Sequence, residues 1–433
     1  MPMIDATIVN VAAPSIARNL PATPTQLQFV VGGYLLAYGS LIITGSRLGA
    51  RYGHVRTLRA ATVGFVVASV ACGLAPDAVV LVAARAVQGM TAAAIMPQVM
   101  SLIQRSYAGP GLARALSMFS LTTAGGFIVG QVGGGLLVAL DVAGLGWRLV
   151  FLVNLPIGLA LLVALCRYFA ADEGDPGTRM DPGGVAAGAA ALLLLIAPLT
   201  FGRDYGWAPW VLVLLALAAP ALGVFAGVER AVARRGGSPL VSAGLLRSRG
   251  FPAAIAVVLL VFANYAGFLF ATTLFLQDEH GYGPLGSGLW FLFFTPGFLA
   301  VTVGWKRLPP RLLGPLVALG AVVIVAGDLL LWWAGRSSSV GLGFALALLI
   351  LGTGTGAMFG PILTLSLRSV APGLAPEASG VVTTMFQVGS AIGVSVIGSV
   401  YFAGGLAAAA VWSALFAGAA GVLVVLTLAR RRA

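Results

Sequence analysis

The stretch "LVAARAVQGMTAAAIMP" (residues 81–97) places one arginine, Arg85, inside an otherwise nearly apolar helical segment. A charge at the centre of a bilayer costs at least about 2.5–3.5 kcal/mol, so such residues usually face the protein interior or a water-filled path. Arg85 is the only basic residue of the chain that we place well inside an apolar segment, away from both of its ends. The rest of the sequence must therefore supply the surroundings that keep it there.

The composition of the whole chain is that of a membrane protein. Of its 433 residues, 59% are hydrophobic and 9% are charged, whereas a soluble domain carries about 25% charged residues. The mean hydropathy is +1.00. Apolar runs recur along the chain, each long enough to cross a hydrocarbon core of ~30 Å as a helix, and alternating strand patterns are absent. The sequence predicts an all-α polytopic membrane protein.

Fourteen apolar segments can be counted. The first is short, carries Asp5 and Pro14, and looks like the second half of a helix, so we expect further residues before it. The segments are 1–18, 27–46, 57–76, 78–104, 112–139, 147–169, 181–201, 209–229, 250–276, 285–304, 311–334, 340–367, 377–402 and 404–429.

The basic residues orient these segments. With a cytoplasmic N-terminus, 20 of the 25 Lys and Arg residues fall in cytoplasmic segments and four in outside loops, as expected for loops that face the cytoplasm. We therefore predict a multi-pass protein of the cytoplasmic membrane with both termini inside. The net charge of +12 is assigned to these loops, and no nucleic-acid partner is expected.

A long basic stretch divides the chain. The predicted domains are an N-terminal six-helix bundle (1–170), an inserted helix pair (181–229), a cytoplasmic linker (230–249) and a C-terminal six-helix bundle (250–433). Related halves of this kind are common in secondary transporters, whose substrate site lies near the middle of the membrane.

Two acids accompany Arg85 within apolar segments, Asp5 and Asp328. Our hypothesis is that Asp5 binds the proton or a cationic substrate while Arg85 modulates it, since a guanidinium and desolvation act in opposite directions on the pKa of a carboxyl group. Two other interpretations stay open: Arg85 snorkels to the interface, or the two residues form a fixed structural ion pair. Asp328 precedes Trp332 and Trp333, which predicts an interfacial position.

Four motifs resemble one family. "IDATIVNVAAPSI" (4–16), "RAVQGMTAAAIMP" (85–97), "WRLVFLVNLPIGL" (147–159) and "ASGVVTTMFQVGSAIGVSVIGSV" (378–400) are similar to helices of the fourteen-span drug:proton antiporter branch of the major facilitator superfamily. The fourth-helix motif matches at Arg85, Gln88 and Gly89. The resemblance implies two six-helix bundles plus an inserted helix pair. It also implies export of lipophilic or cationic small molecules across the lipid bilayer in exchange for protons.

Two further motifs depart from the family pattern. The cytoplasmic loop motif keeps Arg47, Arg51, Gly53 and Arg56 but has Ala50 where the family has an acid. The fifth-helix glycine motif keeps Gly126, Gly130, Gly134 and Gly135 but has Gln131 at the proline position. Proton antiport is therefore open. Independently of the family, Gly126, Gly130 and Gly134 recur every four residues, which predicts one helix face that a neighbouring backbone can approach closely.

A polyspecific cavity needs apolar and aromatic walls with a few polar groups. The candidate lining residues are Tyr34, Tyr38, Asn264, Tyr265, Phe268, Phe386 and Gln387, each of which is individually more often a packing residue. We expect no cofactor and no metal site. The alternatives are an exporter of a specific metabolite or a facilitator without proton antiport, a non-transporting protein derived from this fold, and a membrane-embedded enzyme, which would need a catalytic cluster that the sequence does not show.

Overall fold

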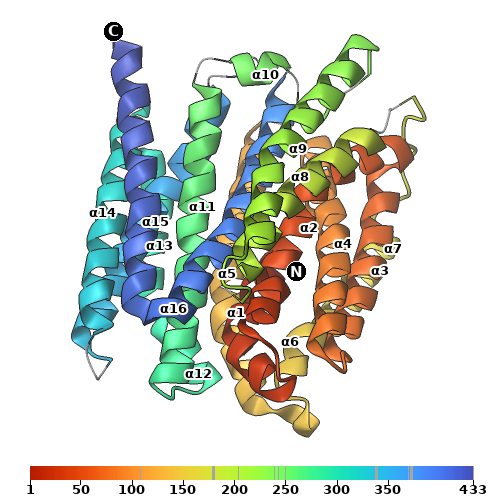
Figure 1. The fold of residues 1–433 in the computed structure, drawn as a ribbon. Coiled ribbons are helices and arrows are strands. Elements are labelled where there is room, and N and C mark those ends of the chain that lie inside the picture. The colour runs from red at the N-terminus through yellow and green to blue at the C-terminus, as the bar shows by residue number, and fades with distance from the viewer. Residues whose placement is uncertain are drawn as a thin grey trace. The chain divides into compact units, whose positions relative to one another are not determined.

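The computed structural model describes residues 1–107, 109–177, 181–202, 204–237, 239–241, 243–248, 250–336, 340–368, 370 and 374–432. Regular structure in these ranges is entirely helical (Figure 1). The chain divides into two compact units. The first consists of Met1–Leu195 with Leu212–Leu240, and the second of Ile196–Val211 with Val241–Ala433.

The first unit holds the helices up to α9, although the end of α8 and the start of α9 belong to the second unit. The elements are α1 (Pro2–Asn19), α2 (Pro24–Tyr52), α3 (His54–Gly73), α4 (Ala78–Ser106), α5 (Gly109–Leu140), η1 (Val142–Gly144), η2 (Gly146–Arg148), α6 (Leu149–Leu152), α7 (Asn154–Tyr168), α8 (Pro182–Phe201) and α9 (Pro209–Arg234).

The second unit holds the remaining helices. They are α10 (Ala243–Arg247), α11 (Phe251–Leu274), η3 (Phe275–Glu279), α12 (Pro284–Trp290), α13 (Phe294–Gly304), η4 (Trp305–Arg307), η5 (Pro310–Leu312), α14 (Leu313–Ala334), α15 (Leu342–Arg368) and α16 (Ala375–Arg432). The tip of the α8–α9 hairpin packs on α16, where the hydroxyl oxygens of Thr200 and Ser395 lie 2.7 Å apart.

The predicted count of fourteen spans is not supported. Among the described residues, ten helices are long and apolar enough to cross a membrane, or eleven if α12 and α13, bent by 42°, form one span. α1 is not among them because Asp5, Asn10 and Arg18 lower its mean hydropathy. Within α5, the stretch Val129–Leu140 is apolar, but it is shorter than the helices that qualify as membrane spans.

The last two predicted segments lie within a single helical element. Residues 377–402 and 404–429 both belong to α16, of which Gly380–Leu428 counts as one candidate span. The helix is interrupted at Gly404 and Gly405, and Gly405 has a φ of +68°, a left-handed conformation that glycine adopts without a steric penalty. Figure 1 shows the chain of α16 turning back on itself near its label.

The glycine motif of α5 faces α1. A Cβ atom at Gly126 would lie 3.3 Å from the Cβ of Met3, one at Gly130 would lie 2.7 Å from the carbonyl oxygen of Ile4, and one at Gly134 would lie 2.7 Å from a side-chain carbon of Ile8. The four-residue spacing thus does line one helix face, and small residues there let two membrane helices approach closely. Gly135 is also buried. This packing fixes the position of α1, which carries Asp5.

The second unit uses the same device between α11 and α16. A Cβ atom at Gly389 would lie 3.0 Å from the Cα of Leu259, and one at Gly393 would lie 2.7 Å from the Cα of Ala263. The two helices therefore touch along their backbones just before Asn264, which brings this side chain to the face of α16.

Candidate functional site

Asp5 and Arg85 form a fully buried ion pair in the first unit. Both side chains are 0% exposed, and Nη1 of Arg85 donates to Oδ2 of Asp5. The guanidinium also donates from Nη1 to Oε1 of Gln88 at 2.6 Å and from Nε to the carbonyl oxygen of Val30 at 2.9 Å. Arg85 therefore does not snorkel to a surface, which excludes that interpretation.

The second oxygen of the Asp5 carboxylate is also saturated. Its Oδ1 accepts hydrogen bonds from Nε2 of Gln88 at 3.0 Å and from Nδ2 of Asn154 at 2.9 Å. Nε2 of Gln88 donates in addition to Oγ of Ser69 at 2.7 Å. We call Asp5, Ser69, Arg85, Gln88 and Asn154 the Asp5 network. A buried ion pair is tolerated when further hydrogen bonds satisfy its remaining polar atoms. Here Val30 of α2, Gln88 of α4 and Asn154 of α7 provide them, and Nη2 of Arg85 is the one atom of the pair without a hydrogen-bond partner among the described residues.

Aromatic rings enclose the guanidinium. The central carbon of the Arg85 guanidinium lies 4.2 Å from the ring centroid of Tyr34 and 5.6 Å from that of Phe151. The Tyr34 hydroxyl donates to the carbonyl oxygen of Pro2 at 3.0 Å. The ring centroids of Tyr34 and Tyr38 lie 6.1 Å apart. A desolvated cation over a ring gains about 2 kcal/mol, so Tyr34 both stabilises Arg85 and ties α2 to the start of α1.

The second buried acid corrects the prediction for Asp328. Its side chain belongs to α14 and is 0% exposed, whereas the nearby Trp333 is 63% exposed. Nδ2 of Asn264 donates to Oδ2 of Asp328 at 3.2 Å and also lies 2.6 Å from Oγ of Ser413. The predicted interfacial position is wrong because the face of α14 that carries Asp328 packs against α16. The neighbouring tryptophans lie near the same helix end, but they do not show which face of the helix is buried.

An acidic residue from another part of the chain contacts the cytoplasmic loop motif. The turn between α2 and α3 is made at Gly53, which has a φ of +96°. Asp172, in the segment after α7, accepts hydrogen bonds from the backbone N–H groups of His54 and Val55, each at 2.7 Å. Arg105 of α4 lies 3.4 Å from the same carboxylate. The position of Ala50 lacks an acid, and the adjacent turn receives one from Asp172.

The environment of Asp172 favours its charged form. Partial burial raises the pKa of this carboxyl, but the hydrogen bonds from the backbone N–H groups of His54 and Val55 lower it, and the net pKa lies below its usual value. Backbone donors at a helix N-terminus stabilise a carboxylate in this way. Of the predicted loop residues, Arg47 donates to the carbonyl oxygen of Pro239 at 2.6 Å, Arg51 lies over the ring of Tyr52, and Arg56 is exposed.

Comparison with known proteins places this arrangement in a family. The sequence profile described as "Major Facilitator Superfamily" matches residues 2–394. The chain belongs to the Major Facilitator Superfamily. It is therefore a membrane transporter with an efflux function and not an enzyme, in line with the predicted class.

Several curated superfamily relatives are named for export or resistance. The chain is 35% identical over 414 residues to the "Probable actinorhodin transporter" of Streptomyces coelicolor, covering 93% of this chain and 70% of the relative. It is 33% identical to "Multidrug resistance protein Stp" of Mycobacterium tuberculosis, with 92% and 73% covered, and 33% identical to "Puromycin resistance protein pur8" of Streptomyces alboniger, with 92% and 78% covered.

Solved structures of the superfamily fold are similar as well. A bacterial homolog of the human lysosomal transporter Spinster matches with a TM-score of 0.69 and 16% identity, covering 98% of this chain and 94% of that chain. The human organic anion transporter MFSD10 matches with a TM-score of 0.66 and 13% identity, covering 98% and 96%. At these identities the match concerns the fold alone.

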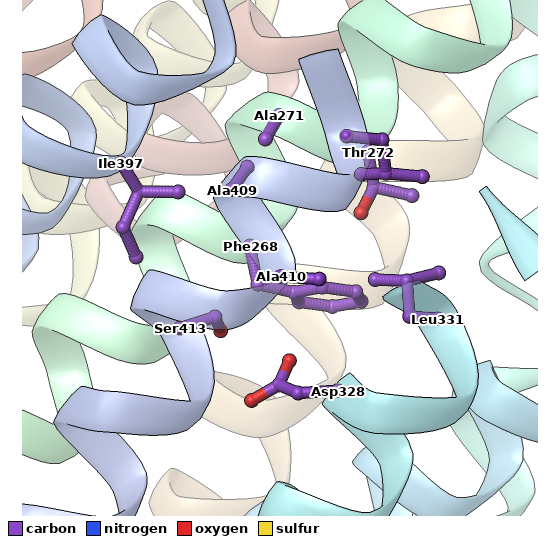
Figure 2. Close-up of a pocket in the computed structure, with 10 residues that line it drawn as sticks. Phe268, Ala271, Thr272, Asp328, Leu331, Ile397, Ala409, Ala410 and Ser413 are labelled. Carbon is purple, nitrogen blue, oxygen red and sulfur yellow. The ribbon is translucent and has the colours of Figure 1, made fainter. Parts of the chain in front are cut away.

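The predicted cavity residues of this superfamily member are mostly enclosed by packing. Tyr34, Tyr38 and Gln387 are 0% exposed, and Asn264 and Tyr265 are buried on α11. The ring of Phe386 packs 3.8 Å from that of Phe262, between centroids. Of the predicted lining residues, Phe268 borders the hollow beside Asp328 (Figure 2). Gly89, predicted as part of the fourth-helix motif, permits close packing of α4 on the backbone of Tyr34.

Several members of the site were not singled out from the sequence. Asn154 lies within the quoted motif of residues 147–159, and Ser69 and Ser413 are single polar residues in apolar runs. A polar side chain in such a run is a usable signal, because polar residues within membrane helices usually bond across helices. Asp172 gave no signal of this kind, since its partners are backbone groups more than 100 residues away along the chain.

Proposed function

We propose that this transporter exports lipophilic or cationic small molecules in exchange for protons, and that Asp5 is the group at which protons couple to transport. The observation that carries this proposal is the enclosed pair of Asp5 and Arg85, which is held by further hydrogen bonds from Gln88 and Asn154. Intramembrane ionisable residues mark ion and substrate pathways.

The geometry suggests competition for one carboxylate. Asp5 already receives the guanidinium and two amide donors, so a proton or a cationic cargo gains access only when Arg85 withdraws. Protonation of Asp5 would in turn leave Arg85 with the carbonyl of Val30, the amide oxygen of Gln88 and the ring of Tyr34. Arg85, a proton and a cationic cargo therefore cannot occupy Asp5 together. Exchange of a cargo for a proton requires this mutual exclusion, whereas joint transport does not.

We further propose the membrane arrangement that the sequence indicates. In it the protein lies in the cytoplasmic membrane with both termini inside, and α1, α5 and the two arms of α16 complete fourteen membrane segments. The domain boundaries at 1–170, 181–229, 230–249 and 250–433 belong to this proposal. The distribution of Lys and Arg between the loops supports it. Labelling of single cysteines from either side of the membrane tests it.

The coupling proposal is tested in proteoliposomes with an imposed proton gradient and a fluorescent lipophilic cation. We expect gradient-driven accumulation in the unmodified protein and its loss in Asp5→Asn and in Arg85→Ala. Glu173→Gln is the matched control, because Glu173 is an exposed carboxylate of the same unit, and it should transport normally. Unchanged accumulation in both site variants would remove the pair from the mechanism.

A second candidate is a transporter dedicated to one natural product. The names of relatives include actinorhodin, puromycin and tetracenomycin C, and the enclosed packing of Tyr34, Tyr38 and Gln387 leaves no open polyspecific wall at these residues. Competition assays with a panel of unrelated cations separate the two, since a dedicated exporter ignores most of the panel.

A further inference from the structure

The second unit contains a buried carboxyl group that the Asp5 network does not include. Asp328 lies on α14, and its Oδ2 accepts from Nδ2 of Asn264 on α11 at 3.2 Å. Its Oδ1 has no hydrogen-bond partner among the described residues. Figure 2 shows the carboxyl group beneath the ring of Phe268 and beside Ser413 of α16.

The surroundings of this carboxyl group are apolar. It borders a narrow hollow, no part of which is wide enough for the centre of a water molecule. The other lining residues are apolar except for Thr272 and Ser413, and Phe268, Leu331 and Ile397 are among the largest of them. A hydrated cation or an organic molecule does not fit this space.

No counter-charge accompanies Asp328 in the described parts of the helices around it. In residues 251–277, 313–335, 342–367 and 378–429, which form α11, α14, α15 and α16 through the apolar region, Asp328 is the only acidic or basic residue. The tyrosines of these helices are Tyr265 and Tyr401. Neither lines the hollow, and the hydroxyl of Tyr401 donates to Glu279 at 2.9 Å.

An ionised carboxylate without a partner in a dry apolar site is strongly disfavoured, and such a group becomes neutral instead. Asp5 escapes this outcome through Arg85, whereas Asp328 interacts only with neutral groups, the amide of Asn264 and the hydroxyl of Ser413. We propose that Asp328 is a second proton-binding site, which holds its proton on Oδ1 while the hollow is closed and exchanges it when the hollow admits water during transport. The exchange step rests on the proposed proton-coupled function; the binding of the proton does not.

The proton itself can be observed by infrared spectroscopy. At neutral pH, the protein in liposomes should show the carbonyl-stretch band of a protonated carboxylic acid. Asp328→Asn should remove this band, and Asp5→Asn should leave it in place. Thr272→Val is the matched control, because its hydroxyl lines the same hollow without bonding the carboxyl, and the band should remain. An unchanged band in Asp328→Asn would overturn the proposal.

Asn264→Ala tests the assignment of the band to Asp328 without relying on the folding of the Asp328→Asn variant. Removing the donor to Oδ2 should move the band to higher frequency, because the carbonyl oxygen loses its hydrogen bond. A band that stays in place in Asn264→Ala does not come from Asp328 and would count against the assignment.

Transport tests the exchange step. In Asp328→Asn, accumulation driven by a proton gradient should fall relative to downhill flux of the same fluorescent cation. An unchanged ratio would overturn the exchange. If the unmodified protein shows no gradient-driven transport, the proposed function fails, while the infrared band still decides whether Asp328 binds a proton.

Discussion

Asp5 and Asp328 are both fully buried carboxyl groups on membrane-type helices, yet their surroundings differ. Asp5 receives a guanidinium and two amide donors, and Asp328 receives one amide donor and borders a dry hollow. The first environment stabilises a charge and the second a neutral acid. Burial alone therefore does not define the state of a carboxyl group. The partners that neighbouring helices contribute do.

Arg85→Ala should have the largest effect on this contrast. It leaves the Asp5 carboxylate buried without its counter-charge, which costs about 3–5 kcal/mol. SDS titration in mixed micelles measures the loss in free energy of unfolding. The double variant Asp5→Asn with Arg85→Gln should lose clearly less than Arg85→Ala, because no unpaired charge remains. Equal losses would mean that the pair is not the source of the effect.

Gln88→Leu should have the next largest effect. It removes one donor from Oδ1 of Asp5 and the acceptor of Arg85 at 2.6 Å, and an unsatisfied buried polar group costs about 1–3 kcal/mol. Asn154→Leu, which removes only a donor to the same oxygen, is the comparison. We expect the two changes to couple by at least about 0.5 kcal/mol in the double variant. Strict additivity would show that the two amides do not share one carboxylate.

Asp172→Ala adds a third carboxylate, outside the membrane segments, to the comparison. It removes two backbone hydrogen bonds at the start of α3, and such a change costs about 1 kcal/mol. Because the pKa of folded Asp172 is lowered, this stabilisation is complete above the unfolded pKa of about 3.9. It disappears as the pH falls through the folded value.

The measurement is the difference in unfolding midpoint between the unmodified protein and Asp172→Ala as the pH is lowered. The difference should vanish in acid. Glu173→Ala, at an exposed neighbouring position, should show no difference at any pH.

Asp328→Asn should have the smallest effect on stability. A neutral amide replaces a neutral acid of the same shape, so the free energy of unfolding at neutral pH should change by less than the roughly 1 kcal/mol that is typical of a point mutation. A gain of several kcal/mol would instead show that Asp328 is ionised in the folded protein. That result would erase the contrast with Asp5.

The sequence indicates the pairing of Asp5 with Arg85 because each is an isolated charge in an apolar segment, and charged residues within membrane helices usually pair with one another. It also indicated the close packing of α1 on α5, because glycines at four-residue spacing share a helix face. Two of its expectations are not met. Asp328 is buried and not interfacial, and the predicted fourteen spans exceed the ten or eleven helices of the described residues that are long and apolar enough to cross a membrane. The break between residues 402 and 404, in contrast, corresponds to the interruption of α16 at Gly404 and Gly405.

What the sequence by itself determined is therefore the class of protein, the helical composition and the presence of charges that require burial, since hydropathy and charge are properties of single residues. Only the tertiary structure decided which face of α14 is covered, that Asn154 and Ser69 complete the Asp5 network, and that Asp172 serves a turn more than 100 residues away. These contacts depend on how helices distant in sequence rotate and pack against one another, and no local pattern records that rotation.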